Sequence, residues 1–100
     1  MATEYQLRQY VVAKGKWDEF ISIFPRIAEV RKAAGFGVVG VWTVPEENRF
    51  IWIVSTDHPE GIEGASHVYY DMPERKAIKL DPDEVFTEIL TTTMTALPGF

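Results

Sequence analysis

The sequence predicts an α+β protein with a ferredoxin-like β-α-β-β-α-β plait, in which helices cover one face of a four-stranded antiparallel sheet. The apolar residues first alternate, then recur at helical spacing, and then alternate again along the chain. Two neighbouring segments are apolar on both faces and are joined by four residues, which is typical of a buried hairpin. The length of 100 residues, with 46% apolar side chains, fits a single domain over residues 1–100.

Residues 4–12 (EYQLRQYVV) alternate and are rich in β-formers, so they are predicted to form the first strand. Because side chains alternate along a strand, one face carries Tyr5, Leu7, Gln9 and Val11, and the other carries Gln6, Arg8, Tyr10 and Val12. The Lys14-Gly15 step ends this strand.

Residues 16–34 have the period of an amphipathic helix. Acidic residues fall in its first turn and basic residues in its last, as the helix dipole favours, and Gly35 is a suitable stop. Pro25 lies inside the segment and predicts a bend. The predicted buried stripe consists of Trp17, Phe20, Ile21, Phe24 and Ala28.

Residues 36–44 and 49–56 are predicted to form the buried hairpin, with a turn at 45–48. The helices of this chain can cover one face of the hairpin. No segment remains to cover the other face, so we expect a second copy of the chain to do so.

The second half of the chain has a weaker pattern. Residues 60–70 are a helix candidate that is diluted by Gly61 and Gly64 and ends before Pro73. Residues 73–86 are expected to add a helical turn or two, with Asp81 or Asp83 as a cap. The threonine-rich residues 87–96 (TEILTTTMTA) are predicted to form the last strand.

Charge and composition exclude several classes of protein. The net charge is −5, and the acidic excess lies in residues 57–100, which hold three basic and nine acidic side chains. This balance argues against a nucleic-acid-binding protein. Without cysteine the chain forms no disulfide or thiolate metal site. No apolar run approaches the ~20 residues of a membrane span and the N-terminus lacks a signal-peptide pattern, so a cytoplasmic location is expected.

The sequence resembles the NIPSNAP group of the dimeric α/β-barrel superfamily, most clearly over residues 4–56. The resemblance lies in an aromatic-x-Leu-Arg-x-Tyr strand, a Lys-Gly step, an acidic-aromatic helix and a Gly-x-x-x-x-Gly-x-Trp strand. The matching positions are Tyr5, Leu7, Arg8, Tyr10, Lys14-Gly15, Glu19-Phe20, Gly35, Gly40 and Trp42. The resemblance implies a homodimer whose two sheets face each other to form a barrel. It also implies a pocket between the sheet and the helices of each subunit.

Three residues are candidates for chemistry in such a pocket. Arg8 stands where haem-degrading relatives carry a pocket-facing asparagine. Its guanidinium fork could bind a carboxylate, an enolate or a phenolate, or it could have a structural role and pair with an acidic side chain or a carbonyl of the protein. Tyr10 shares a strand face with Arg8 and could orient a substrate, although packing in the sheet is its simpler role. His67 could act as an acid or base.

Glu63, His67 and Asp71 follow one another at a spacing of four, which would place them on one face of a helix. Such a face could hold a divalent metal or orient a general base, but a solvated stripe is the simpler interpretation, and we expect no metal site. His58 precedes Pro59 and is expected to be an exposed turn residue. Phe20, Phe24, Trp52 and Tyr70 could line a pocket for a flat organic ligand, although aromatic residues most often form the core.

Two functions follow as hypotheses. The chain is a dimeric NIPSNAP-like protein that binds a small planar organic ligand between sheet and helices. Alternatively, it is an enzyme of the superfamily type that needs no cofactor: a monooxygenase, isomerase or cyclase. Fold alone does not decide between them.

Overall fold

The computed structural model describes residues 3–100 and has the predicted order of elements. The strands are β1 (Glu4–Val12), β2 (Gly37–Val44), β3 (Arg49–Thr56) and β4 (Phe86–Thr95). The helices are α1 (Trp17–Ala33), α2 (Gly61–Asp71), α3 (Pro73–Lys76) and α4 (Pro82–Val85), and a 3-10 turn, η1 (Pro45–Glu47), joins β2 to β3.

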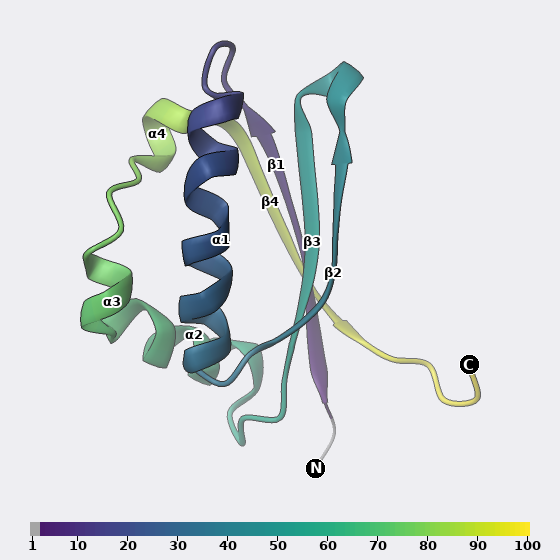
Figure 1. The fold of residues 1–100 in the computed structure, drawn as a ribbon. Helices are drawn as coiled ribbons and strands as arrows, with labels where there is room; N and C mark the ends of the chain where they lie inside the picture. The colour runs from purple at the N-terminus through teal and green to yellow at the C-terminus, as the bar shows by residue number, and fades with distance from the viewer. Residues whose placement is uncertain (1–2) are drawn as a thin grey trace.

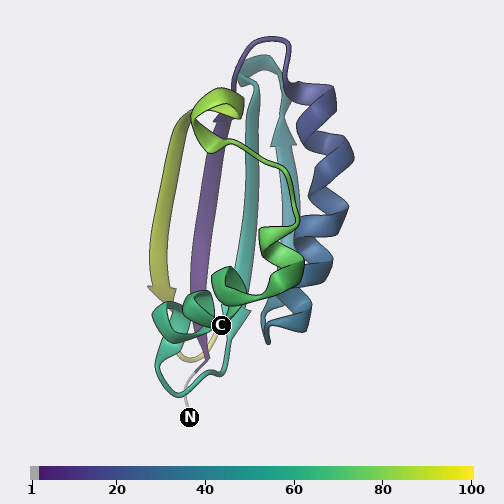
Figure 2. The same cartoon turned by 90° about the vertical axis from the view of Figure 1, so that its left-hand side faces the viewer.

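The four strands form one antiparallel sheet in the order β2-β3-β1-β4, which confirms the predicted ferredoxin-like plait. All the helices lie on the same side of this sheet (Figure 1). Seen from the helical side, α1 runs along one part of the sheet, and residues 61–85 return along the other (Figure 2). No helix in the described part of the chain is long and apolar enough to cross a bilayer.

Strand register decides which side chains lie under the helices. Tyr10 of β1 pairs with Phe50 of β3, and both are buried. Along β3 every second residue is buried, from Phe50 to Thr56. Arg8, two residues before Tyr10, therefore lies on the helical face as well. Leu7 and its partner Ile53 lie on the opposite, open face.

The core is a set of aromatic rings between α1 and the sheet. Phe20 has no exposed surface and contacts four other rings, with centroid distances of 4.9 Å to Phe50, 5.1 Å to Phe86, and 5.9 Å to both Tyr10 and Phe24. Edge-to-face pairs such as Phe20–Phe50 are a favoured geometry for aromatic side chains. The rings hold α1 at a fixed distance from β1 and β3.

The predicted stripe of α1 is wrong in part. The buried positions are Phe20, Ile27, Val30 and Arg31, with Phe24 packed against them, whereas Ile21 is 38% exposed. The buried stripe therefore consists of Phe20, Phe24, Ile27 and Arg31. Compared with the prediction, the helix is rotated about its axis, away from the orientation that would bury Ile21 and Ala28. The hydrophobic pattern did not predict this stripe because its last member, Arg31, is charged and such a pattern does not place a charged residue in the core.

The two glycines expected to weaken the helix at 60–70 instead allow α2 to pack. A Cβ atom at Gly61 would come within 2.6 Å of the Glu4 carboxylate, and one at Gly64 within 2.6 Å of the His58 ring. Gly61 has a φ of +68°, which also favours glycine. Glu4 Oε1 then accepts a hydrogen bond of 2.9 Å from the Ile62 N–H, so β1 caps the first turn of α2.

Replacing Glu4 with alanine is expected to lower the free energy of unfolding by about 1 kcal/mol, because the Ile62 N–H loses its acceptor. Urea unfolding at a fixed protein concentration measures the loss. Glu63→Ala, an exposed change on the same helix, is the control and should shift stability by less than about 0.5 kcal/mol. Equal effects of the two changes would contradict the capping role.

The open face of the sheet is also apolar, but no element of residues 3–100 covers it (Figure 1). Register places Leu7, Ile51, Ile53, Trp42 and Leu90 on this face. Trp42 is 49% exposed and Leu90 is 44% exposed. An apolar surface of this kind on one layer of a two-layer protein is typical of an interaction surface.

Candidate functional site

A cavity of about 90 Å³ lies between the sheet and the helices. Every layer of the helical side contributes to it: β1 and β4 form its floor, α1 and α2 its walls, and α3 with the following segment its cover. The lining residues are Arg8, Tyr10, Phe20, Phe24, Ile27, Arg31, Tyr69, Tyr70, Arg75, Leu80, Pro82, Phe86 and Ile89.

Arg31 is the most unusual residue of the lining. It is 2% exposed, at the C-terminal end of α1, and its guanidinium lies 4.1 Å from the Tyr69 ring centroid and 4.9 Å from that of Phe36. Such contacts attract a cation to the ring face. However, Arg31 Nε and Nη1 are buried and have no hydrogen-bond partner. Buried polar groups are nearly always paired, so two orphan N–H groups on one side chain need an explanation.

Arg75 and Arg8 add two more guanidinium groups. Arg75, on α3, lies 5.5 Å from the ring centroids of both Tyr69 and Tyr70, and its Nε is also buried without a partner. Arg8, on β1, donates from Nε to the Tyr10 hydroxyl (2.8 Å) and from Nη1 to Gln6 Oε1 (2.7 Å). Arg8 is thus oriented by two acceptors of the protein, whereas Arg31 Nε, Arg31 Nη1 and Arg75 Nε are buried without an acceptor.

The pKa values of the two best-buried arginines shift in opposite directions, and only the shift of Arg31 reflects a neighbouring positive charge. Burial, and next the charge of Arg8, lowers the pKa of Arg31. Burial also depresses the pKa of Arg8, but Tyr10 and Tyr70 more than offset this, so the pKa of Arg8 is raised. Arginine stays protonated in proteins despite such shifts. Burial raises the pKa of Tyr69, which keeps that phenol neutral.

No side chain of the lining carries a compensating negative charge. None of the lining residues is Asp or Glu. Within residues 3–100, no ion pair joins Arg8, Arg31 or Arg75 to a carboxylate. The cavity is therefore a cationic site inside a chain whose net charge is −5.

The Tyr10 hydroxyl is held by two donors. It accepts 2.8 Å from Arg8 Nε and 3.0 Å from Trp52 Nε1. Both partners can only donate, so neither uses the hydrogen of the Tyr10 hydroxyl. That hydrogen is available to an acceptor in the cavity.

The sequence predicted five of the lining residues: Arg8, Tyr10, Phe20, Phe24 and Tyr70 lie together at the cavity. Trp52 is fully buried behind Tyr10 and contributes through its hydrogen bond rather than by lining the space. Whether any of these residues binds a ligand or takes part in catalysis stays a prediction.

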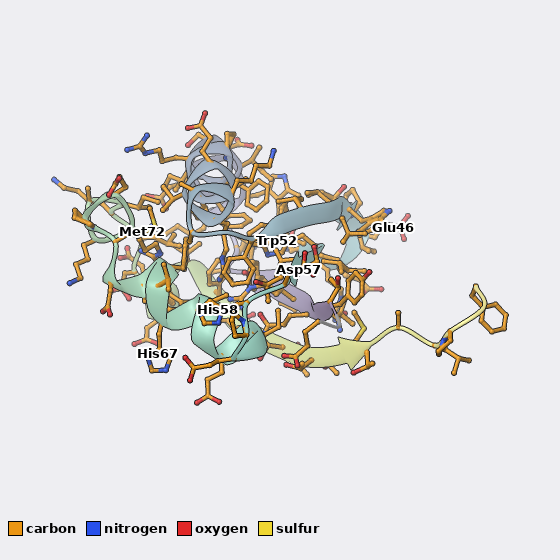
Figure 3. The ribbon with its side chains drawn as sticks, turned by 90° about the horizontal axis from the view of Figure 1, so that it is seen from below. Glu46, Trp52, Asp57, His58, His67 and Met72 are labelled. Carbon is orange, nitrogen blue, oxygen red and sulfur yellow. The ribbon has the colours of Figure 1, made fainter. Side chains whose placement is uncertain are left out.

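The expectation that His67 faces the pocket is wrong. His67 is exposed on α2 and does not line the cavity. It projects from the outer side of the helix, away from Trp52 in the interior (Figure 3). The physical reason is that α2 buries Ile62, Ala65 and Tyr69, and position 67 lies on the opposite side of that helical turn.

Glu63, His67 and Asp71 do lie on a regular helix, α2. Even so, no group of three His, Asp or Glu side chains among residues 3–100 is arranged to hold a metal ion. The three are exposed, as a solvated stripe would be. His58, expected to be an exposed turn residue, is instead half-buried, and its Nδ1 accepts a 3.0 Å hydrogen bond from the Glu60 N–H.

Sequence reasoning missed Arg31 and Arg75 as site residues. Both were unremarkable as basic residues in the last turn of a helix, where the dipole favours them. One signal was available for Arg31, because it lies three and four residues from Ala28 and Ile27 on the apolar side of α1.

The fold and site define a ferredoxin-like α+β protein with an arginine-lined cavity. No family model and no curated protein matches the chain. Solved structures do. An uncharacterized NIPSNAP domain protein from Burkholderia xenovorans has a TM-score of 0.79 at 15% identity, with 97% of each chain covered.

Two further structures are similar. A NIPSNAP family protein with unknown function from Agrobacterium tumefaciens has a TM-score of 0.78 at 12% identity, covering 95% of this chain and 88% of that chain. A Chloroflexus aurantiacus protein, provisionally named an antibiotic biosynthesis monooxygenase, has a TM-score of 0.72 at 14% identity, covering 99% and 97%. The chain thus has the fold of NIPSNAP domain proteins, and the resemblance predicted from its sequence is confirmed at the level of the fold.

Proposed function

We propose that this protein binds a small planar organic ligand in the cavity between sheet and helices. One observation carries the proposal: buried guanidinium N–H groups of Arg31 and Arg75 have no partner and belong to side chains that line an aromatic-walled space. Unpaired buried donors are costly, and a bound ligand would satisfy them. Aromatic walls with a few convergent polar groups are typical of small-molecule sites.

The cavity limits the part of the ligand that is enclosed. Its 90 Å³ is smaller than the ~300 Å³ lower bound of common ligand pockets. Tyr70 and Ile89 line it and are 47% and 48% exposed, so they mark its opening. A ligand would place one end inside and leave the rest against this opening.

Filling the opening tests the proposal. We expect Ile89→Trp, at the opening on β4, to abolish the binding of small planar compounds, read as NMR shifts of amides around the cavity. Val39→Trp is the matched control, because Val39 is 55% exposed on the opposite edge strand. A screen without a binder, or binding that survives Ile89→Trp, would refute a ligand site here.

The protein is also proposed to be a homodimer, formed through the open face of the sheet. Its apolar side chains Leu7, Ile51, Ile53, Trp42 and Leu90 support this, since a second copy presents the same surface. The pairing would bury a face that this chain leaves exposed.

Ile53→Lys, on the open face of a central strand, is expected to raise the dimer dissociation constant at least ~100-fold, because a charge at an apolar interface is costly. Analytical ultracentrifugation measures the change. Ile21→Lys, on the exposed side of α1, should leave the dimer intact. A monomeric wild-type protein would contradict the proposal.

A second candidate function is a cofactor-free enzyme, and the Tyr10 hydroxyl is the observation that favours it. Two donors fix its oxygen and leave its O–H free, so the hydroxyl can donate a hydrogen bond or transfer a proton to a substrate. Among the candidate reactions, the likeness to the Chloroflexus aurantiacus protein supports monooxygenation over isomerisation and cyclisation. With a substrate found by screening, Tyr10→Phe should lower turnover while binding is kept; equal turnover would exclude this role.

A further inference from the structure

We infer that the ligand is a planar organic carboxylate, whose charged group is held by Arg31 and Arg75. The inference rests on the proposed function and names the ligand class of the same cavity. It concerns the charge of the ligand, which the proposed function leaves open.

The first argument is the charge of the lining. Three guanidinium groups line the cavity, and no carboxylate among the lining residues balances them. Other arginines of the described chain do have acidic partners: Arg26 lies 3.9 Å from Glu29 and Arg49 lies 2.9 Å from Glu47. Since buried charges in proteins are normally paired, the missing partner of the cavity arginines is expected to come from the ligand.

The second argument is the arrangement of the free donors. Arg31 and Arg75 both lie on the ring of Tyr69, with their guanidinium carbons 4.1 Å and 5.5 Å from its centroid. Their unpaired atoms are Arg31 Nε, Arg31 Nη1 and Arg75 Nε. The Nε–H and Nη1–H groups of Arg31 point to different sides of its guanidinium, so the three unpaired atoms need separate acceptor lone pairs, and the two oxygens of a carboxylate offer about four. A neutral amide would leave part of this donor set without an acceptor.

The third argument is size and shape. The cavity volume of 90 Å³ corresponds to about three water molecules at ~30 Å³ each, which suits a carboxylate and its first carbon atoms. The rings of Tyr70 and Phe86 and the side chain of Ile89 continue from there toward the opening. These surfaces favour an apolar, flat remainder of the ligand over a fully hydrated inorganic anion.

The Tyr10 hydroxyl completes the set of donors. Its oxygen is occupied by Arg8 and Trp52, so toward the ligand it can act only as a donor. Arg8 fixes Tyr10 and adds positive charge, with two of its five N–H groups bonded to Tyr10 and Gln6.

The test compares benzoate with benzamide, a neutral molecule of the same shape, and with inorganic phosphate, by calorimetric and NMR titration. We expect benzoate to bind at least ~10-fold more tightly than benzamide, since hydrogen bonds to a charged group are stronger. Arg75→Gln should weaken benzoate at least ~10-fold and leave benzamide unchanged. Arg75 is only partly buried, so this variant is expected to fold.

Arg26→Gln is the matched control, because it removes the same charge from an exposed position on α1 outside the cavity. An equal effect of Arg26→Gln and Arg75→Gln would overturn the inference, as would equal affinity for benzamide and benzoate. Tighter binding of phosphate than of benzoate would overturn it in favour of an inorganic anion. Binding of benzamide alone refutes the carboxylate but keeps the proposed ligand site, whereas failure of all the probes and of the wider screen removes both.

Discussion

Truncating Phe20 to alanine is expected to lower the free energy of unfolding by about 3–5 kcal/mol. Phe20 is fully buried and its ring contacts those of Tyr10, Phe24, Phe50 and Phe86. The change removes the ring from the centre of this set, and the strands on one side and α1 on the other cannot close the space. The cost is the lost burial of apolar surface together with the remaining cavity.

The size of this effect is large for a chain of 100 residues, whose total stability is typically about 5–15 kcal/mol. Each kcal/mol corresponds to a fall in Tm of about 4–8 °C. Thermal and urea unfolding at one fixed concentration are the measurements, because dimerisation would make stability depend on concentration.

Ile21→Ala is the control for Phe20→Ala. Ile21 is the next residue of α1 and was predicted from the sequence to share the buried stripe, but it is 38% exposed. Its truncation should cost less than about 1 kcal/mol. If both variants lost several kcal/mol, the rotation of α1 described above would be wrong.

Much of the fold could be predicted because its signals are local. The alternation in residues 4–12 and the apolar, β-branched run in residues 49–56 gave two strands with the observed bounds, since both signals are carried by neighbouring residues. Gly35, predicted as the stop of α1, adopts a φ of +99° just beyond it. Asp81, one of the two predicted caps, accepts the Asp83 N–H at 3.1 Å.

The site could be predicted only in part, because its main feature depends on residues far apart in sequence. Strand alternation placed Arg8 and Tyr10 on one face, and helical spacing added Phe20 and Phe24. The burial of Arg31 depends on rings from Phe36 and Tyr69, which approach it only in the folded protein. The position of His67 was predicted wrongly for a similar reason. Residues spaced by four share one face of a helix, but this spacing does not say whether that face points toward the core.

Replacing Arg31 with methionine is expected to raise the free energy of unfolding of the ligand-free protein by about 1–2 kcal/mol. The arginine is 2% exposed with two unpaired N–H groups. Leaving each such group without a partner costs about 1–3 kcal/mol, and burying an ion costs several kcal/mol. Cation–π attraction to the surrounding rings offsets about 2 kcal/mol of this cost. Methionine is unbranched and flexible, so it can fill the same space and contact the same rings.

Arg31→Ala separates the loss of charge from the loss of volume. It removes the same charge but leaves a cavity beside Phe36 and Tyr69, so it should be less stable than Arg31→Met by about 2–5 kcal/mol. Urea unfolding of the three proteins gives the order. A loss of more than about 1 kcal/mol in Arg31→Met would show that the rings hold the arginine for structural reasons.

Adding a ligand should reverse the order of stability. Benzoate at about 100 times its dissociation constant would stabilise the wild type by about 2.7 kcal/mol through mass action, and it should leave Arg31→Met unchanged. The wild type would then be the more stable protein, although it is the less stable one when the cavity holds no ligand. Such an arginine lowers the stability of the ligand-free protein and raises that of the ligand-bound protein. This is expected at a binding site, because selection for binding retains a residue that selection for stability alone would replace.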